Sequence, residues 1–176
     1  LRPAAFHVSK RLRRALRKNP FTVTTDQAFE AVIAACAHTP RPGQDGTWIT
    51  DAMGKAYVDL HEVGFAHSVE CWQDGELVGG LYGVSLGASF FGESMFSWET
   101  DASKVALATL ACQFLDWAFP FIDCQVANEH LRRLGAEEIP RRRFLRMLEH
   151  ALQHPTRRGP WRLDVTPRDA AGRLRD

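Results

Sequence analysis

Residues 66–97 read AHSVECWQDGELVGGLYGVSLGASFFGESMFS and hold the clearest structural pattern of the chain. Apolar and polar side chains alternate through Ala66–Gln73, and the Asp74–Gly75 pair that follows is typical of a two-residue hairpin turn. Glu76–Ser85 pairs back, and Ala88–Ser97 forms a third strand after another glycine turn. The stretch therefore predicts a meander of three antiparallel strands.

Helical patterns flank this meander on both sides. Before it we expect a helix over Ser9–Lys18, a strand over Phe21–Thr24, a helix from a capping box at Thr24 and Gln27 to about His38, a loop over 39–46 and a helix from Thr50 to about Val63. After it we expect a long helix from Thr100 or Asp101 to about Ala118, a strand over Phe119–Val126, a short helix over Asn128–Leu134 and a helix over Pro140–Gln153. The long helix is apolar nearly all round, which indicates a central position.

This order of elements predicts an α+β fold, with an α/β-like mixed sheet packed on one long buried helix. A length of 176 residues suits one domain. We place that domain at 1–154. The segment 155–176 is rich in Arg and Pro, and we expect it to be a loosely ordered tail.

Composition narrows the functional classes. No apolar run approaches the ~18 residues of a membrane span, and the first residues are too polar for a signal peptide. The four cysteines, Cys36, Cys71, Cys112 and Cys124, form no C-x-x-C pair, and the histidines have no metal-binding spacing. We therefore expect reduced, mostly buried thiols, a cytoplasmic location, no membrane partner and no metal.

Basic side chains gather in clusters although the net charge is only +1. The run KRLRRALRK at 10–18 contains Arg11, Arg13, Arg14 and Arg17, and a second cluster contains Arg141 and Arg142. Local positive patches can bind a polyanion such as RNA in a nearly neutral protein. Solvated helix faces would give the same pattern.

Two segments place polar side chains where a strand should be apolar. In Phe90–Ser97, a period of two puts Glu93 on the same face as Phe91 and Met95. A carboxylate on an apolar face is costly unless it has a hydrogen-bonding or charged partner or a functional role. In Phe121–Val126, Asp123 and Gln125 fall on one face and can share a substrate atom. Gln cannot titrate, so Gln125 can only orient a group or donate a hydrogen bond, whereas Asp123 can act as a base or orient Gln125. The structural alternatives are that Glu93 reaches solvent from an edge strand and that Asp123 caps the next helix.

Glycines and a cysteine carry two weaker signals. Gly79, Gly80 and Gly83 lie within one strand, which indicates close approach of a backbone or ligand, or a bulge. Cys124 could pair with a histidine as a nucleophile, but a buried thiol is the more common role.

Several of these segments resemble one family in order and spacing, the leucyl/phenylalanyl-tRNA–protein transferases. The resemblance covers roughly 47–148, with looser similarity back to Pro3, and its most specific runs are GESMFS at 92–97 and DCQ at 123–125. The other matching runs are Trp48–Thr50, Leu60–His61, Gly64, Ala66–Glu70, Gly79–Val84, Ala102–Lys104, Leu134–Ala136 and Ile139–Arg141.

The resemblance implies a GNAT-like acyltransferase fold and an activity. The activity is transfer of Leu, Phe or Met from aminoacyl-tRNA to proteins that begin with Arg or Lys, which marks them for degradation in the bacterial N-degron pathway. It implies no cofactor, and the CoA-binding loop signature is missing before the long helix. Family members usually carry a preceding N-terminal domain, so the resemblance leads us to expect that this chain begins after it.

The resemblance also implies roles for individual residues. Asp123, Gln125 and Glu93 match the catalytic positions, and Trp48 matches a residue that holds the terminal adenosine. The amino-acid pocket corresponds to Leu81, Phe90, Met95, Leu107, Leu110, Phe114 and Ile122. The arginines of both clusters would hold the tRNA body. Alternative functions are a truncated or inactive tRNA-binding remnant and another GNAT-like acyltransferase.

Overall fold

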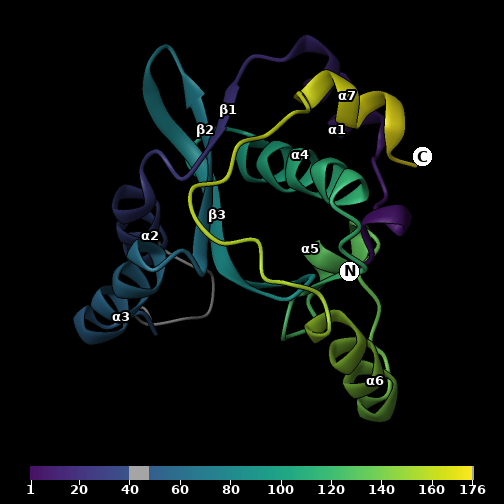
Figure 1. The fold of residues 1–176 in the computed structure, drawn as a ribbon. Helices are drawn as coiled ribbons and strands as arrows, with labels where there is room; N and C mark the ends of the chain where they lie inside the picture. Colours follow the sequence, from purple (N-terminus) through teal and green to yellow (C-terminus); the bar gives the residue numbers. More distant parts are fainter. Residues whose placement is uncertain (40–47, 176) are drawn as a thin grey trace.

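A five-stranded sheet forms the centre of the molecule (Figure 1). The computed structural model describes residues 1–39 and 48–175, so the loop expected over 39–46 lies almost wholly outside the described residues. The strands lie side by side in chain order: β1 (Thr22–Thr25), β2 (Ala66–Gln73), β3 (Glu76–Leu86), β4 (Ser89–Ser97) and β5 (Phe121–Asp123). The first four are antiparallel and β5 runs parallel to β4. The predicted meander and the mixed α+β class are confirmed.

Helices cover both faces of this sheet (Figure 1). On one face lie α2 (Phe29–His38) and α3 (Asp51–Glu62); on the other lies α4 (Ala102–Asp116), with α1 (Lys10–Lys18) and α7 (Pro167–Arg173) packed around it. The helices α5 (Glu129–Arg133) and α6 (Arg141–Leu152) follow β5, and a short 3-10 turn, η1 (Pro3–Ala5), precedes α1. Among the described residues, no helix combines the length and apolarity that a membrane crossing requires.

The central position predicted for the long helix is confirmed. All residues of α4 from Val105 to Phe114 are buried. Its first residue lies directly over β3, because a Cβ built on Gly79 would come within 2.5 Å of the Cβ of Ala102. Gly79 therefore permits the close approach that the glycine-rich strand predicted, and the approaching group is a helix of the same chain.

A β-bulge interrupts the pairing of β3 with β4. Tyr82 faces Ser94 and Gly83 faces Gly92, so Glu93 is the extra residue without a partner on β3. The bulge reverses the alternation of side chains, and Phe90 packs with the α4 core whereas Phe96 packs with the α2 core. The strict period of two from which Glu93 was placed with Phe91 and Met95 would put both of these rings on one face, and it is wrong because of the bulge.

Other element boundaries also differ from expectation. No capping box forms at Thr24, because β1 continues to Thr25 and α2 begins only at Phe29 without a side-chain cap. The strand expected over Phe119–Val126 is reduced to β5. Asp101 stands at the N-cap position of α4, but its φ is +67° and its carboxylate accepts hydrogen bonds from Arg11 and Lys104 rather than capping the helix.

The described part of the segment 155–176, residues 155–175, is not a loosely ordered tail. Trp161 is only 3% exposed and lies in the α4 core, where it stacks on His67 at 3.8 Å between ring centroids. The chain then forms α7, which begins with a capping box at Thr166 and Asp169. Arginine and proline richness concealed the apolar positions that anchor the segment, namely Trp161, Val165, Ala170, Ala171 and Leu174.

Candidate active site

The polar residues singled out in the sequence meet where β4 and β5 separate. Pairing between the two strands ends at Phe91 and Asp123. Beyond this point β4 carries the bulge residue Glu93, and the chain after β5 turns so that the Gln125 side chain reaches back to it. The Nε2 atom of Gln125 lies 3.0 Å from Oε1 of Glu93. The structure thus brings all three predicted catalytic residues into one site.

Asp123 shapes the turn that carries Gln125. Its Oδ1 atom accepts a hydrogen bond from the Gln125 backbone N–H at 2.8 Å, and Gln125 has a φ of +59°. Asp and Asn commonly hold such turns by bonding to the backbone two residues on. Asp123 therefore holds the backbone of Gln125 in a turn, whereas the pair was predicted from a strand period.

Glu93 accepts two side-chain hydrogen bonds, one on each oxygen. Gln125 donates to Oε1, and the hydroxyl of Tyr57 on α3 donates to Oε2 at 2.9 Å. Burial, followed by the hydrogen bond and the negative charge of Glu93, holds the pKa of Tyr57 well above its usual range. The phenol therefore remains a proton donor at any physiological pH, and it holds the carboxylate oxygen that Gln125 does not contact.

Tyr57 was not among the residues predicted for the site. It belongs to a helix far from the strand motifs in sequence, and its ring also packs against Tyr82, which explains it as a core residue. Tyr57 could have been predicted only by combining two observations: it lies on the apolar face of α3, and Glu93 on β4 requires a hydrogen-bond donor.

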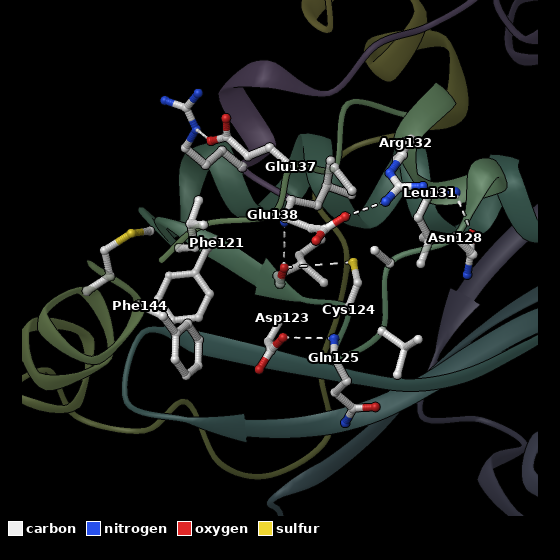
Figure 2. Close-up of a pocket in the computed structure, with 18 of the residues that line it drawn as sticks. Phe121, Asp123, Cys124, Gln125, Asn128, Leu131, Arg132, Glu137, Glu138 and Phe144 are labelled. Carbon is white, nitrogen blue, oxygen red and sulfur yellow. Dashed lines mark hydrogen bonds and ion pairs between the residues drawn. The ribbon is translucent and has the colours of Figure 1, made fainter. Parts of the chain in front are cut away.

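A cavity of about 460 Å³ adjoins this site (Figure 2). Its size falls within the ~300–1,000 Å³ typical of ligand pockets. Asp123 and Gln125 line it together with β5, α5, α6 and the segment between those helices. Figure 2 shows Asp123 and Gln125 on one side of Cys124, and Glu137 and Glu138 on the other. The lining residues are mostly apolar, with charged groups of both signs.

The apolar residues expected to hold the amino-acid side chain also lie together. One core cluster on the α4 side of the sheet contains Leu81, Phe90, Leu107, Leu110, Phe114 and Ile122, and Met95 packs against its edge. These side chains are buried, apart from the half-buried Met95. Trp48 is not part of this cluster and is 38% exposed just before α3.

The basic residues divide between two surfaces. On α1, Arg14 and Arg17 are exposed, whereas Arg11 pairs with Asp101 at 3.0 Å and Arg13 donates to the backbone carbonyls of Ala171 and Leu174. Arg141 and Arg142 are exposed at the start of α6, where Arg141 also lines the cavity. Two of the six arginines therefore stabilise contacts within the protein.

Cys124 lies in the cavity wall, but it is not an activated nucleophile. Burial raises the pKa of its thiol, and burial also lowers the pKa of His130. The imidazole of His67 bonds to Asp26. Within the described ranges, no three His, Cys, Asp or Glu side chains are grouped closely enough to hold a metal ion.

Comparison with known proteins gives one consistent result. The family model for leucyl/phenylalanyl-tRNA protein transferase matches residues 1–149. A leucyl/phenylalanyl-tRNA–protein transferase from Myxococcus xanthus (strain DK1622) is 59% identical over 92% of this chain and 69% of its own length. Proteins with the same name from Alkalilimnicola ehrlichii and Anaeromyxobacter sp. (strain Fw109-5) are 56% and 54% identical over 93% and 97% of this chain.

The chain spans 63% of the Alkalilimnicola protein and 72% of the Anaeromyxobacter protein. The similarity runs through both strands of the site and the helices around it, and the family model alone covers far more than half of the chain. The chain therefore belongs to the leucyl/phenylalanyl-tRNA–protein transferase family.

Proposed function

We propose that this chain is an aminoacyltransferase that moves Leu or Phe, and also Met, from aminoacyl-tRNA to the N-terminal Arg or Lys of acceptor proteins. The observation that carries the proposal is the connected set of Tyr57, Glu93, Gln125 and Asp123 beside a cavity, in a chain of this family. The transfer would commit its acceptors to degradation in the cytoplasm through the N-degron pathway.

The reaction is aminolysis of an ester. The acceptor's α-amine attacks the carbonyl carbon of the aminoacyl group, a tetrahedral intermediate forms, and the 3′-oxygen of the tRNA leaves with a proton. An α-amine has a pKa near ~7.7, so a nearby carboxylate is sufficient to take the proton that it loses. Much of the rate would come from positioning, which can supply about 7–11 kcal/mol in favourable cases.

Each polar residue has a defined part in this mechanism. The carboxylate of Glu93 cannot donate, so the amide of Gln125 must turn its NH₂ group towards it. The Gln125 carbonyl oxygen is then available to accept from the attacking amine. Asp123, half-buried beside it, takes the proton through the oxygen that does not hold the turn. Glu93 orients the aminoacyl ammonium or the cationic end of the acceptor.

The aminoacyl-tRNA would lie across this site. Its Leu or Phe side chain enters the apolar cluster at Met95 on β4 and Ile122 on β5, while Trp48 stacks on the terminal adenosine. Exposed arginines contact phosphates without reading sequence. On the geometry above, Arg14, Arg17, Arg141 and Arg142 are better suited to that role than Arg11 and Arg13.

The fold expected for this chemistry is GNAT-like. This expectation is supported by the arrangement of β4 and β5. The two parallel strands pair over only three residues and then separate, at a bulge in β4 and a turn after β5. A buried helix connects them. The donor here is an ester of tRNA, so the mechanism needs no CoA and no other cofactor.

The test is transfer of radiolabelled Leu from Leu-tRNA to a protein that begins with Arg. We expect Asp123→Ala to lower kcat much more than the affinity for Leu-tRNA, because Asp123 acts on the amine and on the turn rather than on the tRNA. Equal loss of both would exclude the catalytic role. If the chain binds Leu-tRNA without transferring Leu, the result would instead favour a tRNA-binding remnant. If it transfers an acyl group from another donor, the result would favour a different GNAT-like enzyme.

A further inference from the structure

The apolar cluster expected to receive the amino-acid side chain is closed in this structure. Phe90, Leu110 and Phe114 are fully buried, and none of these three side chains lines the cavity beside β5. Protein interiors are close-packed, so a Leu or Phe side chain can enter the cluster only if one of its members moves aside. The member that moves, and the group that stops it, then decide how large a side chain the pocket admits.

Phe90 is the member placed to move. It lies on β4, the strand that also carries Glu93, whereas Phe114 lies on α4 and stacks on Phe119 at 4.4 Å between ring centroids. The ring of Phe90 lies directly over Gly83, since a Cβ built on Gly83 would come within 2.5 Å of it. The backbone of β3 therefore blocks the Phe90 ring on that side.

Trp161 is the other neighbour that confines the Phe90 ring. The two ring centroids lie 5.7 Å apart, and Trp161 also meets Phe114 edge-on at 5.8 Å. His67 on β2 pairs with Gly83 on β3, and Trp161 stacks on His67 at 3.8 Å. The indole thus covers the strand next to the one that Phe90 covers, and it limits how far the Phe90 ring can shift across the sheet.

Hydrogen bonds hold Trp161 in this position. Its backbone N–H donates to Asp26 at 2.6 Å, its carbonyl accepts from the Thr25 hydroxyl at 2.7 Å, and its indole Nε1 donates to the carbonyl of Arg157 at 3.0 Å. The carboxylate of Asp26 also bonds to Nδ1 of His67 at 2.8 Å. One buried carboxylate therefore fixes both Trp161 and the ring on which it stacks.

We propose that Trp161 sets the depth of the amino-acid pocket and so determines which aminoacyl side chains the pocket accepts. The proposal rests on the function given above. The incoming side chain displaces the ring of Phe90, and the indole of Trp161 stops that ring. Trp161 does not touch the substrate, so it is a positioning residue that acts through Phe90. It lies beyond residues 1–149, the part of the chain that the family model matches.

The first experiment measures kcat/KM with Phe-tRNA and with Leu-tRNA as donors. A smaller side chain in place of Trp161 lets the Phe90 ring retreat further, and Leu then fills the deeper pocket less well than Phe does. One methylene in an apolar pocket changes kcat/KM by about 10–200-fold. We expect Trp161→Leu to raise the ratio of Phe-tRNA to Leu-tRNA about tenfold, and the milder Trp161→Phe to raise it by a smaller factor. Circular dichroism identifies a temperature at which both variants are folded.

The matched control is Phe29→Leu. Phe29 is a buried ring, 3% exposed, that meets Tyr82 edge-on in the α2 core, and this core contains none of the residues expected to hold the amino-acid side chain. The variant should lower stability and leave the ratio of the two donors unchanged. If Trp161 had only a structural role, its variants would behave in the same way. An unchanged ratio in Trp161→Phe and Trp161→Leu would therefore overturn the proposal.

A double-mutant cycle tests the route through Phe90. If the Phe90 ring transmits the effect, Trp161→Leu should change the donor ratio much less in a Phe90→Leu background than in the wild type. Independent sites instead give additive effects. Additivity here would mean that Trp161 does not act through Phe90, and the proposal would be wrong.

A binding measurement separates this proposal from the proposed function. The probes are two stable amide analogues of the aminoacylated terminal adenosine, one with Leu and one with Phe, and calorimetry gives their affinities. Trp161→Leu should shift the ratio of affinities towards the Phe analogue. If that shift appears but the wild-type chain transfers neither amino acid, the proposed function fails and the role of Trp161 stands. If the wild-type chain transfers Leu and the affinity ratio does not shift, only the role of Trp161 is wrong.

Discussion

At the scale of single residues, the carboxylate of Glu93 connects α3, β4 and the turn after β5. Both of its oxygens accept hydrogen bonds from groups that can only donate in this arrangement, the hydroxyl of Tyr57 and the NH₂ of Gln125. An amide at this position would have one oxygen to offer and would turn its own NH₂ towards the other donor. The site therefore requires a carboxylate here for geometric reasons as well as for its charge.

We therefore expect Glu93→Gln to lower kcat/KM for transfer by about 10–100-fold, the range for loss of a hydrogen bond to a charged group. Glu93→Gln should also lower the thermal stability of the protein more than Glu93→Asp does, because an Asp carboxylate keeps two acceptor oxygens. Steady-state kinetics and thermal unfolding of both variants test this. If Glu93→Gln were the more active of the two, the two-acceptor argument would be wrong.

Asp101 gives a prediction about pH. Burial alone would raise the pKa of this carboxyl, but the hydrogen bonds and charges of Lys104 and Arg11 lower it below its usual value. A folded pKa below the unfolded one means that the group stabilises the fold above about pH 4, and that this contribution is lost as the pH falls through the lower folded pKa.

Asp101→Asn should therefore lower the free energy of unfolding at pH 7 by about 1–3 kcal/mol. The difference from wild type should shrink progressively below pH 4, as measured by urea unfolding at a series of pH values. Asp74→Asn, on the exposed β2–β3 turn, is the control and should be neutral at every pH. A difference that persists at pH 2 would show that charge is not the cause.

At the scale of elements, the sequence predicted the meander and the buried helix because their patterns are long and periodic. The bulge could not be predicted in this way, since one unpaired residue leaves the alternation of side chains readable on either side of it. Asp123 and Gln125 were found through a strand period that ends before Gln125. The glycines of β3 gave a better indication, because each permits a specific close approach.

Gly83 and Gly92 face each other beside the bulge and make a matched pair. A Cβ on Gly83 would lie 2.2 Å from the backbone oxygen of Phe91 and 2.5 Å from the ring of Phe90, whereas a Cβ on Gly92 would meet nothing closer than 3.6 Å. We expect Gly83→Ala to destabilise the protein by at least about 2 kcal/mol and Gly92→Ala by less than about 1 kcal/mol in urea unfolding. Similar values for both would mean that the bulge relaxes to admit a side chain.

At the scale of the whole molecule, the segment 155–175 connects the sheet with the helix α4. It lies beyond the region that the family model matches, yet Trp161 contacts rings from β2, β4 and α4. Its backbone is fixed as well, because the N–H of Trp161 donates to Asp26 at 2.6 Å and its carbonyl accepts from the Thr25 hydroxyl at 2.7 Å. Composition predicted a tail here, and only the position of the few apolar residues indicates otherwise.

Trp161→Ala should therefore destabilise the whole domain, because it opens a cavity in the α4 core while leaving the backbone hydrogen bonds of the segment intact. Loss of a buried Trp costs about 3–5 kcal/mol, against an expected change within about 0.5 kcal/mol for Arg162→Ala, the exposed neighbour. Urea unfolding followed by circular dichroism measures both. If the segment were only loosely attached, the two variants would unfold at the same urea concentration. Phe90 and Phe114 pack on Trp161 and belong to the cluster proposed to receive the amino-acid side chain. If the segment closes the core, Trp161→Ala should therefore also lose Leu transfer at temperatures where Arg162→Ala keeps it.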